Sequence, residues 1–487
     1  MSASGDGHGG QGGGGVRDDQ DPAAGPGRPG AEGGTEYDVV VIGMGPGGEH
    51  VAGTLAEAGL RVLGVENRLV GGECPYWACV PTKMMVRAAG ALAEARRVPG
   101  LAGRLDGVRP DWSDVHGRIR DEATDDWDDA VAVDRFTGKG GTLVRGTGRL
   151  VGPGRVEVDG VAYTATRGVV VATGSAPAVP DVEGIDDVPY WTNRDATEAA
   201  GLPASVVVLG GGPVGCELAQ AMLRFGVRVA MVERGERLLA RDEPEAADVV
   251  RAAIEADGGT VRTGVATRRV RRGGDGVVVE LDGGEEITAE RLLVATGRRV
   301  DVAGVGLPSV GVPADARTVD VDERGRVADG VWAVGDVTGE GAFTHVAMHQ
   351  ARAVVADVLG REHPPLRYHA LPRVTFTDPE VGTVGLTERE ARERLARVAV
   401  GSTEVSSSAR GWIHGPGNEG LIKLVADAER GVLVGATSAG PVGGEVLGLL
   451  ALAVHAEVPV GTLRSMIYAY PTFHRGIEDA LAALEER

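Results

Sequence analysis

Two cysteines stand close together in a chain that has few of them. The 487 residues include 3 cysteines, and four residues separate Cys74 from Cys79 in the segment GGECPYWACVPTK, residues 71–83. Such a pair can bind a metal, form a structural disulfide or work as a redox couple. Neither a second cysteine pair nor histidines stand at zinc spacing, so we expect no metal site. A cytosolic cysteine pair is more often catalytic than structural.

The residues after Cys79 favour the redox interpretation. Pro81 suits the first turn of a helix. A helix N-terminus lowers the pKa of a thiol and stabilises the thiolate, which is the reactive form. We therefore predict that Cys74 and Cys79 are redox active. The third cysteine, Cys216, is expected to be a small buried residue that packs a helix on a strand, and a third redox thiol is the alternative.

A dinucleotide-binding pattern occurs twice in the chain. Residues 38–66 and 205–233 align without a gap as an apolar strand, GxGxxG, an amphipathic helix, a second apolar strand and a terminal Glu. The first glycine permits the turn, the second lets the backbone approach a pyrophosphate, and the third lets the helix pack on the strand. The helix N-terminus offers amide donors to the phosphates. Cofactor contacts are expected at Gly43, Gly45, Gly48, Gly210, Gly212 and Gly215.

An acidic residue ends the second strand of each copy. Glu66 and Glu233 stand where a carboxylate accepts hydrogen bonds from an adenosine ribose. A carboxylate at Glu233 would repel the 2′-phosphate of NADP, so the sequence favours NADH. Arg228, Arg234 and Arg237 lie nearby in the sequence and keep NADPH as the alternative.

The rest of the chain divides by its composition. Residues 1–36 are rich in Gly, Pro, Asp and Ser without periodic apolar positions, which predicts a disordered tail. Apolar strands at 167–174 and 291–297 close on the same Ala-Thr-Gly turn, and we interpret these turns as crossings between domains. From about Leu371 strand-like segments alternate and are followed by helices, which is typical of an α+β domain.

Charge and hydropathy exclude some partners. The formal net charge of −20 and a pI near 5.0 argue against nucleic acid or an anionic membrane surface as a general partner. The N-terminus lacks the pattern of a signal peptide, and the longest apolar stretch, residues 446–460, is too short and interrupted to span a bilayer. We expect a cytoplasmic protein without a membrane partner.

The motifs follow one another in the order of a known family. They are GMGPGG, GGECPYWACVPTK, ATGS, GGGPVGCE, ATGR, AVGDV and TDPEVGTVG. The sequence resembles the FAD-dependent pyridine nucleotide-disulfide oxidoreductases, the family of dihydrolipoamide dehydrogenase, glutathione reductase and mercuric reductase. The resemblance implies an α/β fold with two Rossmann-like domains and a C-terminal α+β dimerisation domain. The implied domains are 37–188 with 297–366 for FAD, 189–296 for NAD(P) and 367–487 for dimerisation.

The resemblance also implies roles for single residues. Cys79 would form the charge-transfer thiolate against the flavin, and Cys74 would exchange with the substrate. Lys83 matches a family lysine near flavin N5, and Glu217 matches its carboxylate partner; an acid that meets the dipole in a first helical turn is the alternative for Glu217. Asp336 would hydrogen-bond the ribityl chain. Further cofactor contacts are implied at Gly148, Thr173, Gly174, Gly297 and Thr344.

The C-terminal motif departs from the family. Dihydrolipoamide dehydrogenase and glutathione reductase end with a His-Pro-Thr motif whose His, paired with a Glu, is the acid/base for the thiols of the other subunit. Here Tyr470 replaces that His and Arg475 replaces the Glu. A tyrosine with a pKa near about 10 is a poor base at neutral pH. His474 is a candidate substitute, although a helix-surface histidine is the preferred interpretation. His345 matches a family histidine near the flavin, with a structural role.

These features predict a homodimeric flavoenzyme with an active site shared between subunits. Electrons would pass from NAD(P)H through FAD to a Cys74–Cys79 disulfide and on to a disulfide or another small-molecule acceptor. The alternatives are a quinone or dye reductase, a soluble transhydrogenase, which has a similar Tyr-Pro-Thr motif, and a mercuric-reductase-like enzyme, although no cysteine follows Cys216. A flavoprotein that serves as a subunit or redox-sensing partner is the non-catalytic alternative.

Overall fold

The computed structural model describes residues 35–274 and 276–486. Residues 1–34 of the predicted disordered tail, residues 1–36, therefore lie outside the described residues. Its predicted end is too late, because Glu36 is already the first residue of β1 (Glu36–Ile42).

The first nucleotide unit is built on a sheet with the strand order β17-β18-β6-β1-β2-β3. The partners of β1 in this path are β17 (Arg326–Ala328), β18 (Val331–Ala333), β6 (Val161–Val171), β2 (Val62–Glu66) and β3 (Thr142–Arg145). β1 pairs in parallel with β2 and β6, and its last four residues are buried, as expected for a strand covered on both faces.

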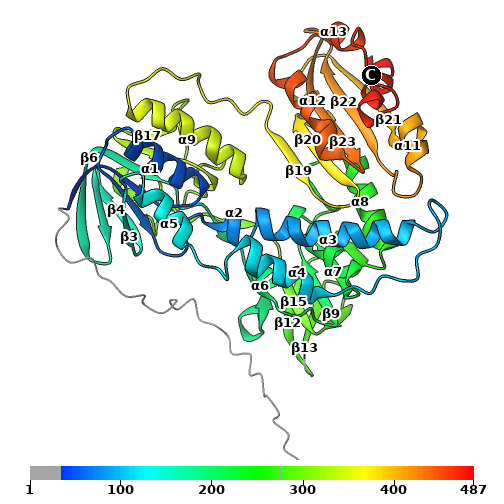
Figure 1. Ribbon diagram of the computed structural model, residues 1–487, viewed down its shortest axis with the longest axis horizontal. Coiled ribbons are helices and arrows are strands. Elements are labelled where there is room, and N and C mark those ends of the chain that lie inside the picture. The colour runs from blue at the N-terminus through cyan, green and yellow to red at the C-terminus, as the bar shows by residue number, and fades with distance from the viewer. Residues whose placement is uncertain (1–34, 275, 487) are drawn as a thin grey trace, which may run out of the picture.

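Helices and a small antiparallel extension complete this unit. α1 (Pro46–Glu57) and α9 (Thr344–Val358) pack together against β1, and α5 (Ala130–Thr137) adds Phe136 to the same apolar cluster (Figure 1). β4 (Gly148–Gly152) and β5 (Arg155–Val158) extend β6 as an antiparallel ladder.

The second nucleotide unit repeats the parallel architecture with the strand order β11-β10-β9-β15-β8. Its strands are β11 (Thr260–Thr263), β10 (Arg228–Glu233), β9 (Ser205–Leu209), β15 (Arg291–Val294) and β8 (Tyr190–Trp191). Its helices are α6 (Asn193–Glu198), α7 (Pro213–Arg224) and α8 (Pro244–Ala256). An antiparallel sheet of β12 (Thr267–Gly273), β13 (Gly276–Leu281) and β14 (Glu286–Ala289) lies beside it.

The two units are joined by a pair of short crossing strands. β7 (Ala176–Pro177) and β16 (Arg298–Arg299) pair antiparallel directly after the two Ala-Thr-Gly turns. Gly174 and Gly297 have φ of 64° and 127°, which glycine adopts without a steric penalty. The predicted crossings at these turns are confirmed.

The C-terminal domain is an antiparallel sheet covered by helices. The strand order β19-β20-β23-β22-β21-β24 consists of β19 (Pro372–Thr375), β20 (Glu380–Gly385), β23 (Val432–Gly440), β22 (Leu421–Asp427), β21 (Val398–Glu404) and β24 (Glu485–Glu486). The helices are α10 (Glu388–Arg394), α11 (Ala409–His414), α12 (Gly443–His455), α13 (Val460–Arg464) and α14 (Gly476–Ala482). The predicted fold class, two Rossmann-like units and an α+β domain, is confirmed.

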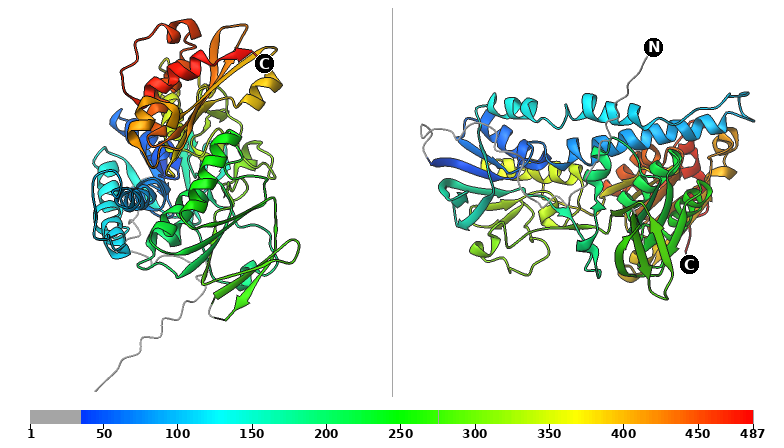
Figure 2. Two further views of the ribbon diagram at one scale, coloured as in Figure 1. Left: turned by 90° about the vertical axis from the view of Figure 1, so that its right-hand side faces the viewer. Right: turned by 90° about the horizontal axis from the view of Figure 1, so that it is seen from below.

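The cysteine segment lies where the three parts meet. α2 (Glu73–Tyr76) and α3 (Cys79–Arg97) run across the molecule, with the first unit at one end, the second unit below and the C-terminal domain above (Figure 1). α3 is followed by α4 (Trp112–Arg118) and a π-helix (Ile119–Ala123), which lie along the same side (Figure 2). Short 3-10 helices lie at Ile185–Asp187, Leu307–Val310, Asp336–Thr338, Val405–Ser407 and Phe473–Arg475. Within the described ranges, none of the helices is both long and apolar enough to cross a bilayer.

Candidate active site

The two cysteines of the predicted redox pair lie on consecutive helices. Cys74 belongs to the single turn α2, and Cys79 is the first residue of α3, so its thiol lies at the positive end of a helix of 19 residues. Cys79 Sγ lies 3.4 Å from Thr344 Oγ1, at the first residue of α9. Both thiols are half-buried.

The surroundings of the two thiols differ in their effect on pKa. A hydrogen bond from the Cys74 thiol, assisted by Thr344 and the charge of Lys83, lowers the pKa of Cys79 to about 6 against the opposing effect of burial. The same hydrogen bond, together with burial, raises the pKa of Cys74 far above its ordinary value. In the dithiol form the thiolate at neutral pH therefore resides on Cys79.

Lys83 and Glu217 form an ion pair beside this centre. Lys83 Nζ lies 2.7 Å from Glu217 Oε2 and sits 4.8 Å from the ring centroid of Phe376. Glu217 is buried, and its other oxygen accepts a hydrogen bond of 2.9 Å from the backbone N–H of Phe376. The alternative interpretation of Glu217 is wrong, because the residue lies in the second turn of α7 and not in the first.

The first glycine loop has the shape that a diphosphate needs. Gly45 caps α1 without a side-chain hydrogen bond, which leaves the first amides of the helix free to donate. A Cβ on Gly43 would lie 2.5 Å from Ala172 O, and one on Gly48 would lie 2.0 Å from Gly43 O. The start of the cysteine segment closes on this loop, because a Cβ on Gly72 would lie 2.8 Å from the Cα of Gly45.

Glu66 is arranged to accept two further hydrogen bonds. Its carboxylate accepts one bond of 2.7 Å from Met44 N and one of 2.8 Å from Arg68 N, and burial raises its pKa. A carboxylate offers about four acceptor positions. Two positions therefore remain for the hydroxyl groups of a ribose, and the residues of this unit fit an FAD molecule.

The remaining candidate flavin contacts surround the same loop. Thr173 and Gly174 follow β6 and lie next to Gly43, because a Cβ on Gly43 would lie 2.9 Å from Thr173 Cα. Gly148 begins β4 and packs on the ends of β1 and β2, because a Cβ there would lie 2.9 Å from Ile42 Cγ2. Asp336 accepts a hydrogen bond of 2.5 Å from Ser175 Oγ.

The second glycine loop repeats this geometry with more open space. A Cβ on Gly210 would lie 2.4 Å from Ala295 O, and one on Gly215 would lie 2.2 Å from Gly210 O. A Cβ on Gly212, in contrast, would meet no atom within 4 Å. The half-buried Glu233 accepts hydrogen bonds from Gly211 N (2.6 Å) and Gly235 N (2.5 Å), so it too has acceptor capacity left for a ribose.

The three arginines near Glu233 lie in different places. Arg228 begins β10 and is therefore at the far end of the strand from Glu233. Arg237 Nη2 donates to the carbonyl groups of Ala240 (3.0 Å) and Asp242 (3.1 Å). Arg234 is exposed and, in the described part of the chain, has no ion pair or hydrogen bond from its side chain.

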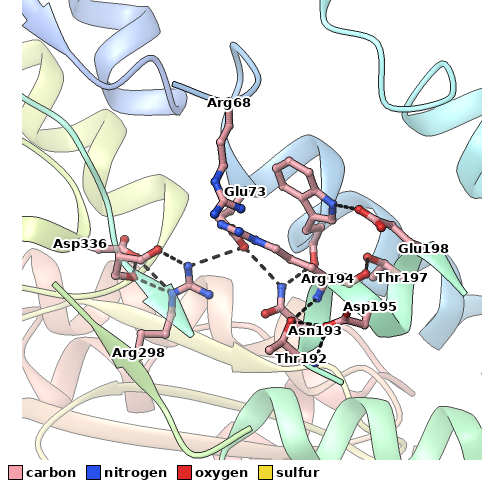
Figure 3. A network of polar contacts seen from close by, with 12 residues as sticks. Arg68, Glu73, Thr192, Asn193, Arg194, Asp195, Thr197, Glu198, Arg298 and Asp336 are labelled. Carbon is pink, nitrogen blue, oxygen red and sulfur yellow. Dashed lines mark hydrogen bonds and ion pairs between the residues drawn. The ribbon is translucent and has the colours of Figure 1, made fainter. Parts of the chain in front are cut away.

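A polar network that the sequence did not predict surrounds α2. Glu73 forms an ion pair with Arg194 and lies 3.6 Å from Arg298, which in turn donates to Ser175 Oγ at 2.6 Å (Figure 3). Burial raises the pKa of Glu73. In the sequence, the signal for this network is the acidic residue directly before Cys74. Arg194 gives no such signal, because it stands in a polar segment that resembles any helix start.

Two smaller predictions can be compared with the structure. Cys216 is fully buried in α7 and its Sγ lies 3.4 Å from Gly211 O, so the packing interpretation is confirmed over a third redox thiol. Burial raises its pKa. His345 Nε2 lies 3.0 Å from the carbonyl of Pro372, and its ring stacks on Phe343, which favours the structural role.

The C-terminal candidates lie apart from the cysteine pair. Tyr470 is 69% exposed and lies in the segment between α13 and α14. These two helices lie in the C-terminal domain, away from α2 (Figure 1). Arg475 stacks on the Tyr470 ring and pairs with Glu478 at 3.3 Å. His474 is half-buried in the short helix Phe473–Arg475. Over the described ranges of this one chain, neither Tyr470 nor His474 has a hydrogen bond or ion pair with the cysteine segment.

Comparison with known proteins gives a consistent result over almost the whole chain. Residues 37–351 match the model of the pyridine nucleotide-disulphide oxidoreductases, and residues 371–481 match the dimerisation domain of that family. The chain is 35% identical to dihydrolipoyl dehydrogenase of Thermus scotoductus, over 93% of this chain and 98% of that protein. It is 33% identical to mercuric reductase of Streptomyces lividans, over 91% and 96%. The crystal structure of LpdA from Mycobacterium tuberculosis has a TM-score of 0.80 and 26% identity, over 91% and 99%.

Proposed function

The chain belongs to the pyridine nucleotide-disulphide oxidoreductases, and from that premise we propose that it passes electrons from NADH to a small disulfide through the Cys74–Cys79 pair. FAD and NAD(P)H are the cofactors of this class of enzyme. A bound FAD would supply the two-electron chemistry between the nicotinamide and the disulfide. The observation that carries the proposal is the asymmetry of the two thiols, which gives Cys79 the lower pKa beside Lys83 and Thr344.

The proposed roles follow from that asymmetry. Cys79 holds the thiolate in the resting dithiol, and Cys74 exchanges with the acceptor: its proton passes to a base as its sulfur bonds one sulfur of the acceptor disulfide, and the other acceptor sulfur leaves as a thiolate. Lys83, fixed by Glu217, stabilises the negative charge that develops beside it. We propose Gly43, Gly45, Gly48, Glu66, Gly148, Thr173, Gly174, Gly297, Asp336 and Thr344 as the residues that contact FAD, and Gly210, Gly212, Gly215 and Glu233 as those that contact the nicotinamide nucleotide.

NADH is the proposed donor. A 2′-phosphate beside the proposed ribose acceptor Glu233 would add a second negative charge, and Arg237 is already bonded to two carbonyl groups. Arg228 lies at the opposite end of β10. Of these three arginines, Arg234 is then the one able to turn toward a phosphate, and its exposure weakens such a pair.

We also propose a homodimer with the domain division given above, 37–188 with 297–366, 189–296 and 367–487. Large apolar side chains are exposed on the C-terminal domain, including Ile467 (98%), Trp412 (78%) and Tyr470 (69%). Burial of these side chains against a second copy would bring Tyr470 and His474 of one subunit toward the thiols of the other. A reducing compartment, the cytoplasm, suits a relay that cycles through free thiols.

An anaerobic titration with NADH tests the relay. We expect a long-wavelength absorbance from the Cys79 thiolate beside the flavin, which Cys79→Ser abolishes and Cys74→Ser retains. Reduced flavin without this absorbance in the wild type would contradict the relay. The acceptor is then identified by comparing lipoamide and low-molecular-weight disulfides with quinones.

A second candidate function, quinone or dye reduction, is favoured by one observation. Tyr470 and Arg475 replace the acid/base pair that dithiol exchange uses in relatives, and they stack on each other. The Cys74→Ser/Cys79→Ser variant separates the two functions: full retention of quinone reduction favours the second candidate, and its loss favours the relay. A mercuric-reductase activity is not favoured.

A further inference from the structure

α6 contacts the redox segment on both sides of Cys74. Arg194 pairs with Glu73, the residue before Cys74, through an Nε to Oε1 hydrogen bond of 2.6 Å (Figure 3). Asn193 Nδ2 donates to the Trp77 carbonyl at 2.9 Å, and Glu198 accepts a hydrogen bond of 2.7 Å from Trp77 Nε1. We call Asn193, Arg194 and Glu198 the α6 clamp.

The turn that carries Cys74 cannot hold its own position. α2 has four residues, and so short a helix is not stable by itself. Its closure depends on the Glu73 carbonyl, which accepts from Trp77 N (2.9 Å) and Ala78 N (2.8 Å). Contacts to Glu73 and Trp77 therefore fix the whole turn, including Cys74 between them.

The clamp itself is anchored in the second nucleotide unit. α6 begins with a capping box. The Asp195 carboxylate accepts a hydrogen bond from Thr192 N at 2.7 Å, and the Thr192 hydroxyl accepts one from Arg194 N at 3.3 Å. β8, directly before it, pairs in parallel with β15 of the parallel sheet. The Arg194 guanidinium also lies 5.0 Å from the centroid of the Trp77 ring. The redox turn is thus tied to a rigid element of another unit.

The Glu73–Arg194 pair of the clamp is half-buried, although Glu198 is exposed. The side chains of Glu73 and Arg194 are 22% and 21% exposed, so their pair is less screened than a surface pair. Arg298 approaches the second oxygen of Glu73 at 3.6 Å and continues to Asp336 at 3.7 Å. Breaking the Glu73–Arg194 contact would leave a half-buried charge without its partner, which destabilises this arrangement of the turn.

We propose that the α6 clamp is a positioning device for Cys74, which holds α2 so that the Cys74 thiol stays in hydrogen-bonding contact with Cys79. The proposal rests on the thiol relay described above. Glu73, Trp77 and Arg194 act through Cys74 and touch neither thiol in any hydrogen bond described for this chain, so they are positioning residues.

The sign of the expected effect separates positioning from simple electrostatics. Loss of the Glu73 carboxylate alone would remove a nearby negative charge and lower the pKa of Cys79. A displaced α2 turn would instead remove the hydrogen bond from Cys74 to Cys79. Because this bond is the largest cause of the low pKa of Cys79, that pKa would rise. For Glu73→Gln the two explanations therefore predict shifts in opposite directions. For the uncharged Trp77→Phe only the loss of position predicts a rise, whereas loss of the Arg194 cation raises the pKa of Cys79 under both explanations.

The test measures the pH midpoint of the Cys79 thiolate in the reduced holoenzyme. The variants are Glu73→Gln, Arg194→Gln and Trp77→Phe, which removes the indole N–H that donates to Glu198 and leaves a smaller ring beside Arg194. Glu94→Gln is the matched control, because Glu94 pairs with Arg97 on α3 and is 60% exposed. The readouts are the flavin–thiolate absorbance and the rate of alkylation of Cys79 by iodoacetamide, followed by mass spectrometry.

We expect the midpoint of all three variants to rise by about one unit or more, which is about a fivefold loss of thiolate at the wild-type midpoint and about a tenfold loss well below it. Glu94→Gln should keep the wild-type midpoint, and the KM for NADH should not change in any variant. In the Arg194→Gln/Trp77→Phe double variant the shifts should not add, because both act on one turn. Flavin content and thermal unfolding verify that each variant is folded.

An unchanged or lowered midpoint in folded Glu73→Gln and Arg194→Gln would overturn the clamp. A wild type without the absorbance would instead overturn the proposed function, and the alkylation midpoint would still decide about the clamp.

Discussion

The two nucleotide units share a motif but differ in how the chain encloses it. Gly45 of the first loop lies against Gly72 of the redox segment, whereas Gly212 of the second loop has no neighbour that a Cβ would meet within 4 Å. Glu66 is 8% exposed, and Glu233 is only half-buried. The same fingerprint thus gives one closed site and one open site.

The difference comes from segments outside the fingerprint. The cysteine segment follows β2, and its Gly72 lies against Gly45 of the first loop. The equivalent segment after β10 bonds its loop one residue earlier, from Leu239 N to Gly211 O at 2.8 Å, and leaves Gly212 without a neighbour. A closed site suits a cofactor that stays bound through many turnovers, and an open site suits one that binds and leaves in each turnover. The comparison supports the proposal that the first unit holds a resident FAD and that the second unit exchanges its nucleotide.

The largest expected effect is on the closed loop. Gly72→Ala places a Cβ 2.8 Å from the Gly45 Cα in a backbone with φ of 67°, so the loop must move. We expect protein that purifies with little or no FAD. Gly212→Ala adds the same methyl group in the open loop and should keep its FAD, with a KM for NADH raised about tenfold because the methyl group would face the pyrophosphate. Absorbance spectra and steady-state kinetics measure both, and equal flavin loss in both variants would contradict the comparison.

The two ribose-site acids should separate in the same way. Glu66→Gln leaves one of the amides of Met44 and Arg68 without its charged acceptor, a loss of about 1.5–3 kcal/mol. We expect FAD to dissociate about ten- to a hundredfold more readily and the thermal midpoint to fall. Glu233→Gln should keep FAD and raise the KM for NADH. Flavin release under mild denaturant, measured by fluorescence, checks the first effect, and a Glu233→Gln variant that releases FAD equally would break the comparison.

The local sequence pattern predicted the two nucleotide units and the cysteine pair, whereas the contacts between the units become visible only in the structure. The gapless repeat, the crossing turns and the cysteine pair are encoded in spacing, so the sequence predicts them. The Lys83–Glu217 contact, between residues 134 positions apart, was accessible only through family resemblance. The Glu73–Arg194 pair joins residues 121 positions apart in two units, and only Glu73 belongs to a recognisable motif, the cysteine segment. Such a contact depends on how the units pack, which residue periodicity does not record.

The thiolate should depend on the ion pair that joins the two units. The pKa of Cys79 is lowered to about 6, so the thiolate absorbance should be half lost near that pH as the solution is acidified. Lys83→Met removes a cation that favours the thiolate, and the midpoint should rise by about one unit, about a tenfold effect. Lys139→Met is the control, because Lys139 is 35% exposed, close to the 37% of Lys83, and pairs with Glu57 on the first unit. A midpoint that does not move in Lys83→Met would show that the ion pair does not act on Cys79.

The smallest effect concerns the open site and its donor. Arg234 is exposed near Glu233, and an exposed pair with a phosphate contributes about 0.2–1 kcal/mol. Arg234→Ala should therefore raise the KM for NADPH about two- to fivefold and leave the KM for NADH unchanged. Arg228→Ala should change neither value, because Arg228 lies at the other end of β10. Steady-state kinetics with both nucleotides measure these shifts. An equal loss with NADH would mean that Arg234 supports the nucleotide through its diphosphate and that the second site is less open than the loop around Gly212 indicates.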